Sequence, residues 1–185
     1  MGPPGAGKGT QAGRLADRLG VPAVSTGDIF RANVRAGSEL GRTAQRYMDA
    51  GDYVPDEVTN AMVRDRLGQP DAAAGFLLDG YPRTTAQVSE LDDMLADAGC
   101  DLDAVVELFV DVEELVARLS QRSAAEGRSD DSEQVVRRRM QVYAEQTAPL
   151  VEVYNRRGLL HRVDGMGQVD EVTARLLAAV GTVQA

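Results

Sequence analysis

Tryptophan is absent from this 185-residue chain, and cysteine occurs once, at Cys100. A single cysteine excludes a disulfide within the chain and a zinc site made of cysteines. Aromatic residues make up 4% of the sequence, so the core must consist mainly of leucine, valine and alanine. No apolar run approaches the about 18 residues that a membrane-spanning helix needs. The N-terminus has neither the basic nor the apolar segment of a signal peptide, so we expect a cytoplasmic protein that does not bind membranes.

Lysine is nearly absent as well. The net charge of −9 argues against a nucleic-acid-binding protein, whose binding face would be basic. Of the 20 basic residues, one is Lys8 and all the others are arginines, the side chain best suited to bidentate phosphate recognition. A compositional bias toward arginine explains most of them. It does not explain why the one lysine lies in a glycine-rich segment.

Apolar runs and amphipathic stretches alternate along the chain, which is typical of an α/β fold with a parallel sheet, and the length suits one domain, residues 1–185. We expect strands at residues 22–25, 75–79, 104–110 and 159–163. We expect helices from the glycine-rich loop to Leu19 and at residues 26–36, 39–50, 55–67, 84–97, 113–122, 132–145 and 169–180. The spacing of Leu91, Met94, Leu95 and Ala98 predicts one buried helix face.

Two stretches interrupt this alternation. The connection between the first two strands, residues 26–74, is mostly helical and much longer than a plain crossover needs, which indicates an inserted helical subdomain. Residues 122–131 are polar, contain a glycine and are bracketed by arginines. On composition alone, this second stretch is an ordinary loop between two helices.

Residues 2–10 read Gly-Pro-Pro-Gly-Ala-Gly-Lys-Gly-Thr and match the phosphate-binding loop through Gly-x4-Gly-Lys. Glycines recur because backbone N–H groups must wrap an anion without interference from Cβ atoms. The following helix directs its N-terminus at the phosphates, and Lys8 would neutralise the β and γ oxygens. In the strict motif a serine or threonine follows the lysine directly. Here Gly9 intervenes and the hydroxyl comes at Thr10, which is the form found in nucleoside monophosphate kinases.

Further segments fit the same family. Ser25-Thr26-Gly27-Asp28 follows a strand, and Arg31 comes one helical turn later. Residues 76–83, Phe-Leu-Leu-Asp-Gly-Tyr-Pro-Arg, form a buried strand that ends in a carboxylate, then a turn and an arginine; taken alone, this turn is as well explained by a β-turn without chemistry. Asp130-Asp131 precedes a helix with arginines at 137–139, and Thr-Ala-Pro-Leu at 147–150 closes the helix after it. On these motifs the chain resembles, over essentially its whole length, the short-lid adenylate kinases within the nucleoside monophosphate kinase family.

The resemblance implies a P-loop three-layer α/β sandwich with a parallel sheet, a helical AMP-binding insert at residues 25–54 and a short lid at residues 122–131. The core then comprises residues 1–24, 55–121 and 132–185. In the family, which has five strands, an apolar strand precedes the loop at the centre of the sheet. Here only Met1 stands before Gly2, so we expect this first strand to be missing from the sequence given. Longer relatives carry a longer lid, often with zinc-binding cysteines, and this chain has neither.

The resemblance also implies the reaction ATP + AMP = 2 ADP, with Mg²⁺ and without zinc, in a monomer whose partners are the small molecules ATP, AMP and ADP. The nucleophile would be an AMP phosphate oxygen, whose second pKa is about 6, so no general base is required. Catalysis would rest on positioning and charge neutralisation. His161, the only histidine, is expected to be structural.

Matching motif positions give the site residues that the resemblance implies. The catalytic residues would be Lys8, Arg83, Arg118, Arg122, Arg128 and Arg139. ATP would be bound by Gly5, Ala6, Gly7, Lys8, Gly9, Thr10, Arg118, Arg122 and Gly167. AMP would be bound by Thr26, Arg31, Asp52, Tyr53, Val54, Gly80, Tyr81, Pro82, Arg83, Gln87, Arg128 and Arg139. Asp79 would hold Mg²⁺ through water, because Mg²⁺ keeps much of its hydration shell. A cis peptide bond before Pro82 would fix the turn that directs Arg83, while Arg137 and Arg138 are expected to be surface charges.

Two other functions stay open. Gln87 lies one helical turn after Arg83, and its amide can pair with the Watson–Crick edge of adenine. Relatives that act on pyrimidines tend to carry asparagine at this place, so a UMP/CMP kinase fits the loop but not Gln87. A catalytically impaired nucleotide-binding protein is the alternative if the first strand is truly absent. A GTPase is disfavoured, because no Asn-Lys-x-Asp motif occurs.

Overall fold

The computed structural model describes residues 1–126 and 132–181, and the side chains of residues 121–126 are not part of the description. The strands are β1 (Ala23–Ser25), β2 (Leu77–Asp79), β3 (Val105–Phe109) and β4 (Leu160–Asp164). The helices are α1 (Lys8–Leu19), α2 (Thr26–Ala36), α3 (Glu39–Ala50), α4 (Asp56–Leu67), α5 (Thr85–Ala98), α6 (Val112–Glu126), α7 (Glu133–Val142), α8 (Leu150–Arg156) and α9 (Val169–Gly181), with a 3₁₀ turn η1 (Pro70–Ala72) and a π-helical turn η3 (Tyr143–Thr147). Within these residues, no helix is both long enough and apolar enough to cross a membrane.

The strands form two parallel pairs. β1 pairs with β2, which places Ala23 opposite Leu77 and Ser25 opposite Asp79. β3 pairs with β4 over its full length. On its other edge, β3 hydrogen-bonds the backbone of Met1, whose carbonyl accepts from the Leu108 N–H at 3.0 Å. The expected α/β class and the parallel sense of pairing are confirmed, and the strands stand as two pairs, each of two strands.

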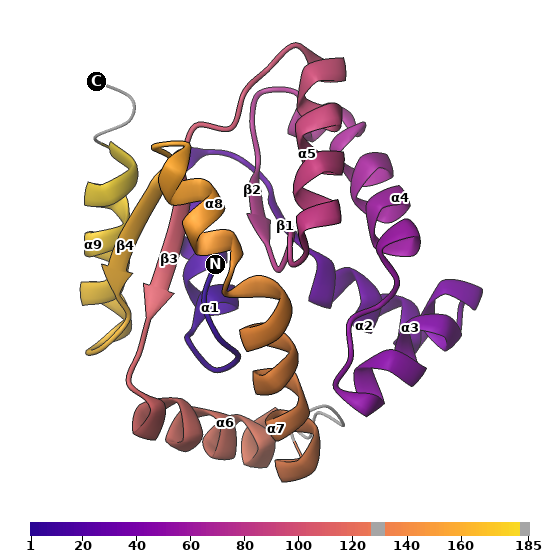
Figure 1. The fold of residues 1–185 in the computed structure, drawn as a ribbon, viewed down its shortest axis with the longest axis vertical. Coiled ribbons are helices and arrows are strands. Elements are labelled where there is room, and N and C mark those ends of the chain that lie inside the picture. Colours follow the sequence, from indigo (N-terminus) through magenta and orange to yellow (C-terminus); the bar gives the residue numbers. More distant parts are fainter. Residues whose placement is uncertain (127–131, 182–185) are drawn as a thin grey trace.

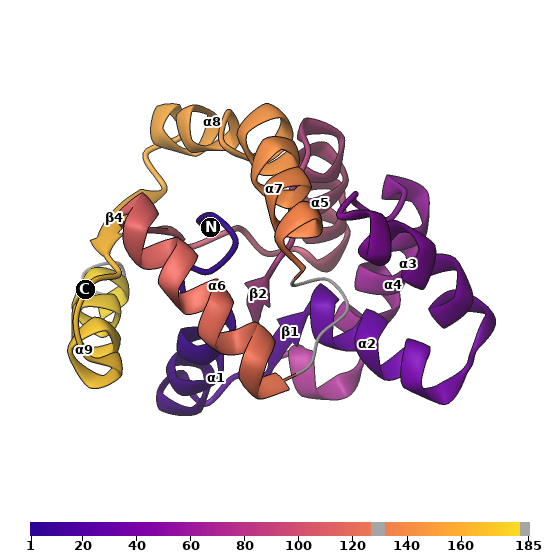
Figure 2. The same ribbon diagram turned by 90° about the horizontal axis from the view of Figure 1, so that it is seen from below.

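Helices cover both faces of the strands and make three layers (Figure 1, Figure 2). α1 and α9 lie against one face, where Leu15, Leu108 and Leu176 belong to one buried cluster. α5 and α8 lie on the opposite face, where Leu91 and Tyr154 are almost completely shielded from solvent. Burial on both faces explains why the strands read as continuous apolar runs in the sequence.

Several predicted boundaries are corrected by the structure. α6 continues to Glu126 instead of stopping at residue 122, so the first part of the expected lid is helical. The helix predicted at 132–145 ends at Val142 and passes into the π-helical turn η3. α8 was not predicted, because residues 147–150 were interpreted as the end of helical structure. Ala98 is exposed, unlike Leu91, Met94 and Leu95 on the same predicted face, because it is the last residue of α5.

The predicted helical insert consists of α2 and α3, packed against each other beside the β1–β2 pair (Figure 1). Serine side chains begin both helices: Ser25 Oγ accepts from the Asp28 N–H at 3.3 Å, and Ser38 Oγ accepts from the Gly41 N–H at 3.0 Å. Such caps satisfy N–H groups that a helix start leaves without partners. Gly41 lies so near α2 that an added Cβ would stand 2.2 Å from the Asn33 carbonyl oxygen. The two helices therefore depend on a glycine at their closest approach.

A Gly41→Ala substitution is expected to destabilise the protein by about 1–3 kcal/mol, because the clashing atom belongs to the backbone and cannot rotate away. Gly13→Ala is the matched control: Gly13 lies in α1, and an added Cβ there meets nothing within 4 Å. That control should gain about 0.5–1 kcal/mol of stability from higher helix propensity. Urea unfolding of the three proteins measures both effects. Equal stability of the Gly41→Ala variant and the parent would show that α2 and α3 are not held this closely.

Candidate active site

The glycine-rich loop turns sharply before α1, with Gly5 at φ 87° and Gly7 at φ 89°, a region that side chains other than glycine rarely adopt. Helix α6 packs directly against it, because a Cβ at Gly5 would meet Leu119 Cγ at 3.0 Å and the Leu115 carbonyl oxygen at 3.2 Å. Gly7 is the N-cap of α1, so no side chain caps this helix start. The first N–H groups of α1 are therefore available to an anion, as the motif predicted.

Lys8 folds its side chain back across the loop. Its Nζ donates to the carbonyl oxygens of Gly2 at 2.7 Å and Pro3 at 2.9 Å. These contacts hold the ammonium group beside the open start of α1. A fixed positive charge and exposed N–H groups thus share one face of the loop.

Arg118, on α6, lies next to the same loop. Its Nε donates to Glu114 Oε1 at 2.7 Å and its Nη2 donates to the Gly165 carbonyl oxygen at 3.0 Å. A Cβ added at Gly7 would stand 3.7 Å from Arg118 Nη1, which places the guanidinium against the loop. Gly167 follows at φ 97° in the loop after β4. Arg118 and the 165–167 loop are thereby brought to the phosphate-binding loop.

Two of the predicted phosphate-binding arginines are not placed by the structure. The backbone of Arg122 belongs to α6, and its side chain is not among those described. Arg128 lies outside the described residues. Their roles stay predictions.

Asp79 ends β2 and faces the beginning of α1. Ser25 Oγ donates to its Oδ2 at 3.4 Å, and a Cβ at Gly9 would stand 3.5 Å from the same oxygen. Asp28 lines the same hollow, which holds about 500 Å³ of empty space. Among the described side chains, no group of three or more His, Cys, Asp or Glu is arranged around a single metal position. An ion bound at this oxygen-lined place would take its remaining ligands from water or from a bound molecule.

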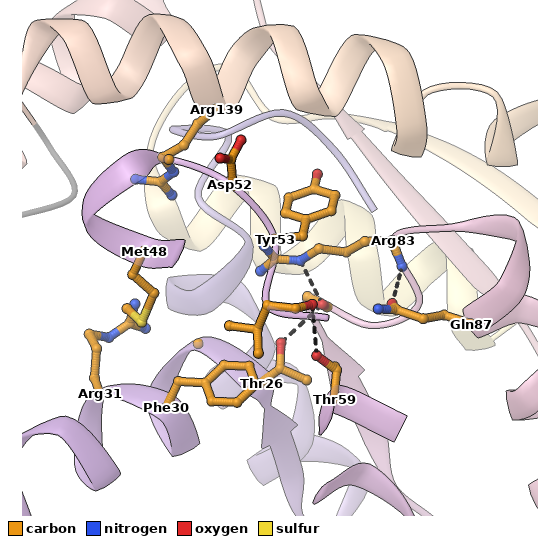
Figure 3. Close-up of a pocket in the computed structure, with 14 residues that line it drawn as sticks. Thr26, Phe30, Arg31, Met48, Asp52, Tyr53, Thr59, Arg83, Gln87 and Arg139 are labelled. Carbon is orange, nitrogen blue, oxygen red and sulfur yellow. Dashed lines mark hydrogen bonds between the residues drawn. The ribbon is translucent and has the colours of Figure 1, made fainter. Parts of the chain in front are cut away.

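A second pocket, with about 610 Å³ of empty space that includes open solvent, lies between the insert and the ends of β1 and β2 (Figure 3). The residues that line it are Thr26, Gly27, Phe30, Arg31, Met48, Gly51, Asp52, Tyr53, Val54, Thr59, Gly80, Arg83, Gln87 and Arg139. Most residues predicted to bind AMP are in this set, although they come from four separate stretches of the chain.

Arg83 is held on several sides. Its Nε donates to the Gly80 carbonyl oxygen at 2.7 Å, and its guanidinium carbon lies 4.9 Å from the centre of the Tyr53 ring. The Gly80 carbonyl also accepts from Thr26 Oγ1 at 3.0 Å. The expected cis peptide bond between Tyr81 and Pro82 is present. The Arg83 guanidinium therefore lies in the pocket with little freedom to move.

Two more arginines line the pocket from opposite sides (Figure 3). Arg31, on α2, forms an ion pair with Asp28, and a Cβ at Gly27 would stand 3.0 Å from Arg31 Nη2. Gly27 thus leaves room for the Arg31 guanidinium. Arg139 reaches the pocket from α7. With Arg83, these side chains give the pocket a positive charge inside a protein of net charge −9, which favours an anionic ligand.

Asp52 and Tyr53 join the insert to distant helical segments. Arg138 Nε donates to Asp52 Oδ1 at 2.7 Å, so Arg138 connects α7 to the insert, and its side chain is exposed, as expected for a surface charge. The Tyr53 hydroxyl lies 2.8 Å from Thr147 Oγ1, which itself donates to the Arg83 carbonyl oxygen at 2.8 Å. Arg137 pairs with Glu133 on the exposed side of α7, as expected for a surface charge.

Tyr81 and Pro82 do not line the pocket, although both were predicted to bind AMP. Both are buried, and Tyr81 belongs to the core cluster that contains Leu91. The Tyr81 hydroxyl donates to Asn60 Oδ1 at 2.9 Å, and burial raises the pKa of Tyr81 well above its usual value. Tyr81 is therefore a neutral core residue that supports the turn from beneath.

Sequence reasoning missed Thr147 and Asp56, which hold pocket residues from behind. Thr147 was noted only as part of a helix end, yet it contacts Tyr53 and the Arg83 backbone. Asp56 begins α4 and hydrogen-bonds the Gln87 amide at 2.6 Å. Asp56 belongs to none of the motifs and Thr147 belongs to one that indicated only a helix end, so the role of each follows only from its three-dimensional contacts.

Comparison with known proteins gives one consistent result. A family profile described as adenylate kinase matches residues 1–159. An adenylate kinase of Nocardioides sp. is 63% identical over 183 residues, covering 99% of this chain and 96% of that protein. An adenylate kinase of Thermobifida fusca is 61% identical over 180 residues (97% and 95%), and one of Kocuria rhizophila is 62% identical over 180 residues (97% and 96%).

Proposed function

This chain belongs to the adenylate kinase family, and we infer that it catalyses reversible phosphoryl transfer, ATP + AMP = 2 ADP. The observation that carries this function is the arginine-lined pocket beside the phosphate-binding loop. Arg31, Arg83 and Arg139 line the pocket, while Lys8 and Arg118 lie at the loop. Two anion sites in one chain are what a reaction between two nucleotides needs.

The loop is the proposed ATP site. The N–H groups at the start of α1 would bind the phosphates, and Lys8 would exchange its carbonyl partners for phosphate oxygens. Arg118 would add a second positive charge from α6. Gly167 is also proposed to contact ATP. It lies in the loop after β4, which Arg118 connects to the glycine-rich loop through its hydrogen bond to the Gly165 carbonyl.

The arginine-lined pocket is the proposed AMP site. Arg31 and Arg83 would hold the phosphate, with Arg139 on the side of the transferring group. Thr26, Tyr53 and Val54 would shape the space between phosphate and base, because all three line the pocket. Gln87, at the far wall in Figure 3, would meet the base.

The chemistry that this site supports is neutralisation of charge. The AMP phosphate is mostly doubly ionised at neutral pH, because its second pKa is about 6. The attacking oxygen therefore needs no proton acceptor, and the arginines would align it and stabilise the charge that spreads over the transferring group. Residues 25–54 as an AMP-binding insert and 122–131 as a lid would exclude water, which would otherwise accept the phosphoryl group.

Mg²⁺ fits the place where β2 ends. Asp79 would hold it through water, with Ser25 and Asp28 lining the same hollow, and all three offer oxygen atoms. When bound, the ion neutralises charge on the ATP phosphates. Zinc is not part of the proposal. We also propose a cytoplasmic monomer, as the resemblance to adenylate kinases implies; elution of a dimer in size-exclusion chromatography would contradict the monomer.

A coupled assay for ADP formed from ATP, AMP and Mg²⁺ tests the function. We expect ADP to appear only when both nucleotides are present, and chelation of Mg²⁺ with EDTA should suppress it. With UMP or CMP in place of AMP, the rate should fall strongly. ATP binding without any dependence on AMP would instead identify a nucleotide-binding protein, and a preference for UMP or CMP would identify a pyrimidine nucleotide kinase.

A further inference from the structure

The carboxamide of Gln87 is held by two partners, the backbone of Arg83 and the side chain of Asp56, which does not line the pocket. Its Oε1 accepts from the backbone N–H of Arg83 at 2.7 Å. Its Nε2 donates to Asp56 Oδ1 at 2.6 Å. Gln87 is 2% exposed, yet it lines the pocket, so the amide forms part of the wall of the pocket rather than a mobile side chain.

These partners fix which way the amide faces. A backbone N–H can only donate, so the atom next to it must be the oxygen. A carboxylate can only accept, so the atom next to Asp56 must be the nitrogen. Turning the amide over would place two donors against each other at Arg83 and two acceptors against each other at Asp56. The two contacts independently demand the same orientation.

Asp56 is itself fixed. It is the first residue of α4, and its second oxygen, Oδ2, accepts from Thr84 Oγ1 at 2.8 Å. Thr84 in turn caps α5, because its Oγ1 accepts from the Gln87 N–H at 3.1 Å. Asp56 does not line the pocket. It can therefore act on a ligand only through Gln87.

In this orientation the amide keeps one N–H donor and one oxygen lone pair for a ligand. Adenine offers the complementary pair on its Watson–Crick edge, an acceptor at N1 and donors at the 6-amino group. Hypoxanthine has nearly the same shape, but it offers a donor at N1 and an acceptor at the 6-oxo group, which calls for the opposite amide orientation. Building on the proposed function, we propose that Asp56 is a positioning residue that locks the Gln87 amide and so makes the acceptor site select 6-amino over 6-oxo purine nucleotides.

The test compares AMP with IMP as acceptors, through the ratio of their kcat/KM values. In Asp56→Asn and Asp56→Ser, the new side chain can either donate or accept, so one of the two contacts that oppose a turned amide is lost and only the Arg83 N–H still opposes it. Both variants should lower the AMP-to-IMP ratio by about tenfold or more, mainly by improving IMP. The AMP-to-CMP ratio should stay unchanged, because cytosine presents the same order of acceptor and amino donor as adenine.

Glu57→Gln is the matched control. Glu57 lies beside Asp56 in the first turn of α4, so its replacement removes the same charge from the same helix start. Glu57 is exposed and does not line the pocket. Its ratios should equal those of the parent protein. A lower AMP-to-IMP ratio in this control would show that the lost negative charge at the start of α4 causes the change, and not the lost contact between Asp56 and the Gln87 amide.

Thermal unfolding of each variant shows which of them are folded at the assay temperature, and the serine variant carries the test if the asparagine variant is not. An unchanged AMP-to-IMP ratio in a folded Asp56 variant overturns the proposal. A general loss with every acceptor, at constant ratios, also overturns it, because it would show a purely structural role. The parent protein separates this inference from the function: if it makes no ADP from ATP and AMP, the function itself fails.

Discussion

Lys8→Met is expected to lower kcat by about three orders of magnitude, the range found when a single charge that stabilises a transferring phosphoryl group is removed. Methionine keeps the length and most of the volume of lysine, so the loop should keep its course past Gly2 and Pro3, whose carbonyl oxygens Lys8 now contacts. What disappears is the positive charge beside the open start of α1. The coupled ADP assay measures kcat, and circular dichroism shows whether α1 still forms.

Arg14→Met provides the control for Lys8→Met. Arg14 is also on α1, but its ion pair with Asp170 is exposed and distant from the loop. This variant loses one positive charge from the same helix and should keep the activity of the parent within about twofold, because exposed ion pairs contribute little. If both variants lost activity equally, the total positive charge on α1 would determine kcat, and a specific role for Lys8 would be excluded.

Local sequence signals predicted most of the helices and strands. Serine or threonine at the start of α2, α3 and α5 and glycine at their ends mark these helices, because a cap needs only neighbouring residues. α8 escaped prediction for the same reason: Pro149 at its start looks like a terminator, but proline is well tolerated at a helix N-terminus. α6 likewise continues to Glu126 through polar, serine-containing residues whose composition is typical of a loop.

The residues of the site also differ in whether neighbouring sequence could reveal them. The glycine-rich loop and the residues around Arg83 are contiguous motifs, so they could be recognised in the sequence, and the structure places Arg83 at the pocket and Gly7 at the start of α1. Asp56, Thr147 and Arg138 could not be found, because each acts through a contact with a residue far away in the chain. Tyr81 shows the opposite error: a motif carries it beside site residues, yet its ring faces the core. Membership of a motif thus predicts the course of the backbone better than the direction of each side chain.

Arg83→Ala is expected to lower kcat/KM for AMP by about a thousandfold, while the Kd for ATP changes by less than about threefold. The guanidinium lies in the pocket proposed to bind AMP, held between the Gly80 carbonyl and the Tyr53 ring, so its loss should remove a fixed charge from that pocket alone. The fold should survive. The Gly80 carbonyl still accepts from Thr26 in the variant, and the Arg83 backbone still contacts Gln87 and Thr147, so no buried polar group loses its last partner.

Arg157 offers a control of the same design outside the pocket. Its guanidinium also stacks on a tyrosine, 5.6 Å from the centre of the Tyr154 ring, and forms two hydrogen bonds with Asp92. Arg157→Ala should reduce stability and leave kcat/KM for AMP unchanged. Arg83→Ala should lower kcat/KM for AMP and leave stability nearly unchanged. Arg83→Lys should fall between Arg83→Ala and the parent, because an ammonium keeps the charge but not the planar pair of donors that fits a phosphate. Equal losses for AMP and ATP in Arg83→Ala would show that this arginine serves both nucleotides, and the division of the site into an ATP loop and an AMP pocket would then be wrong.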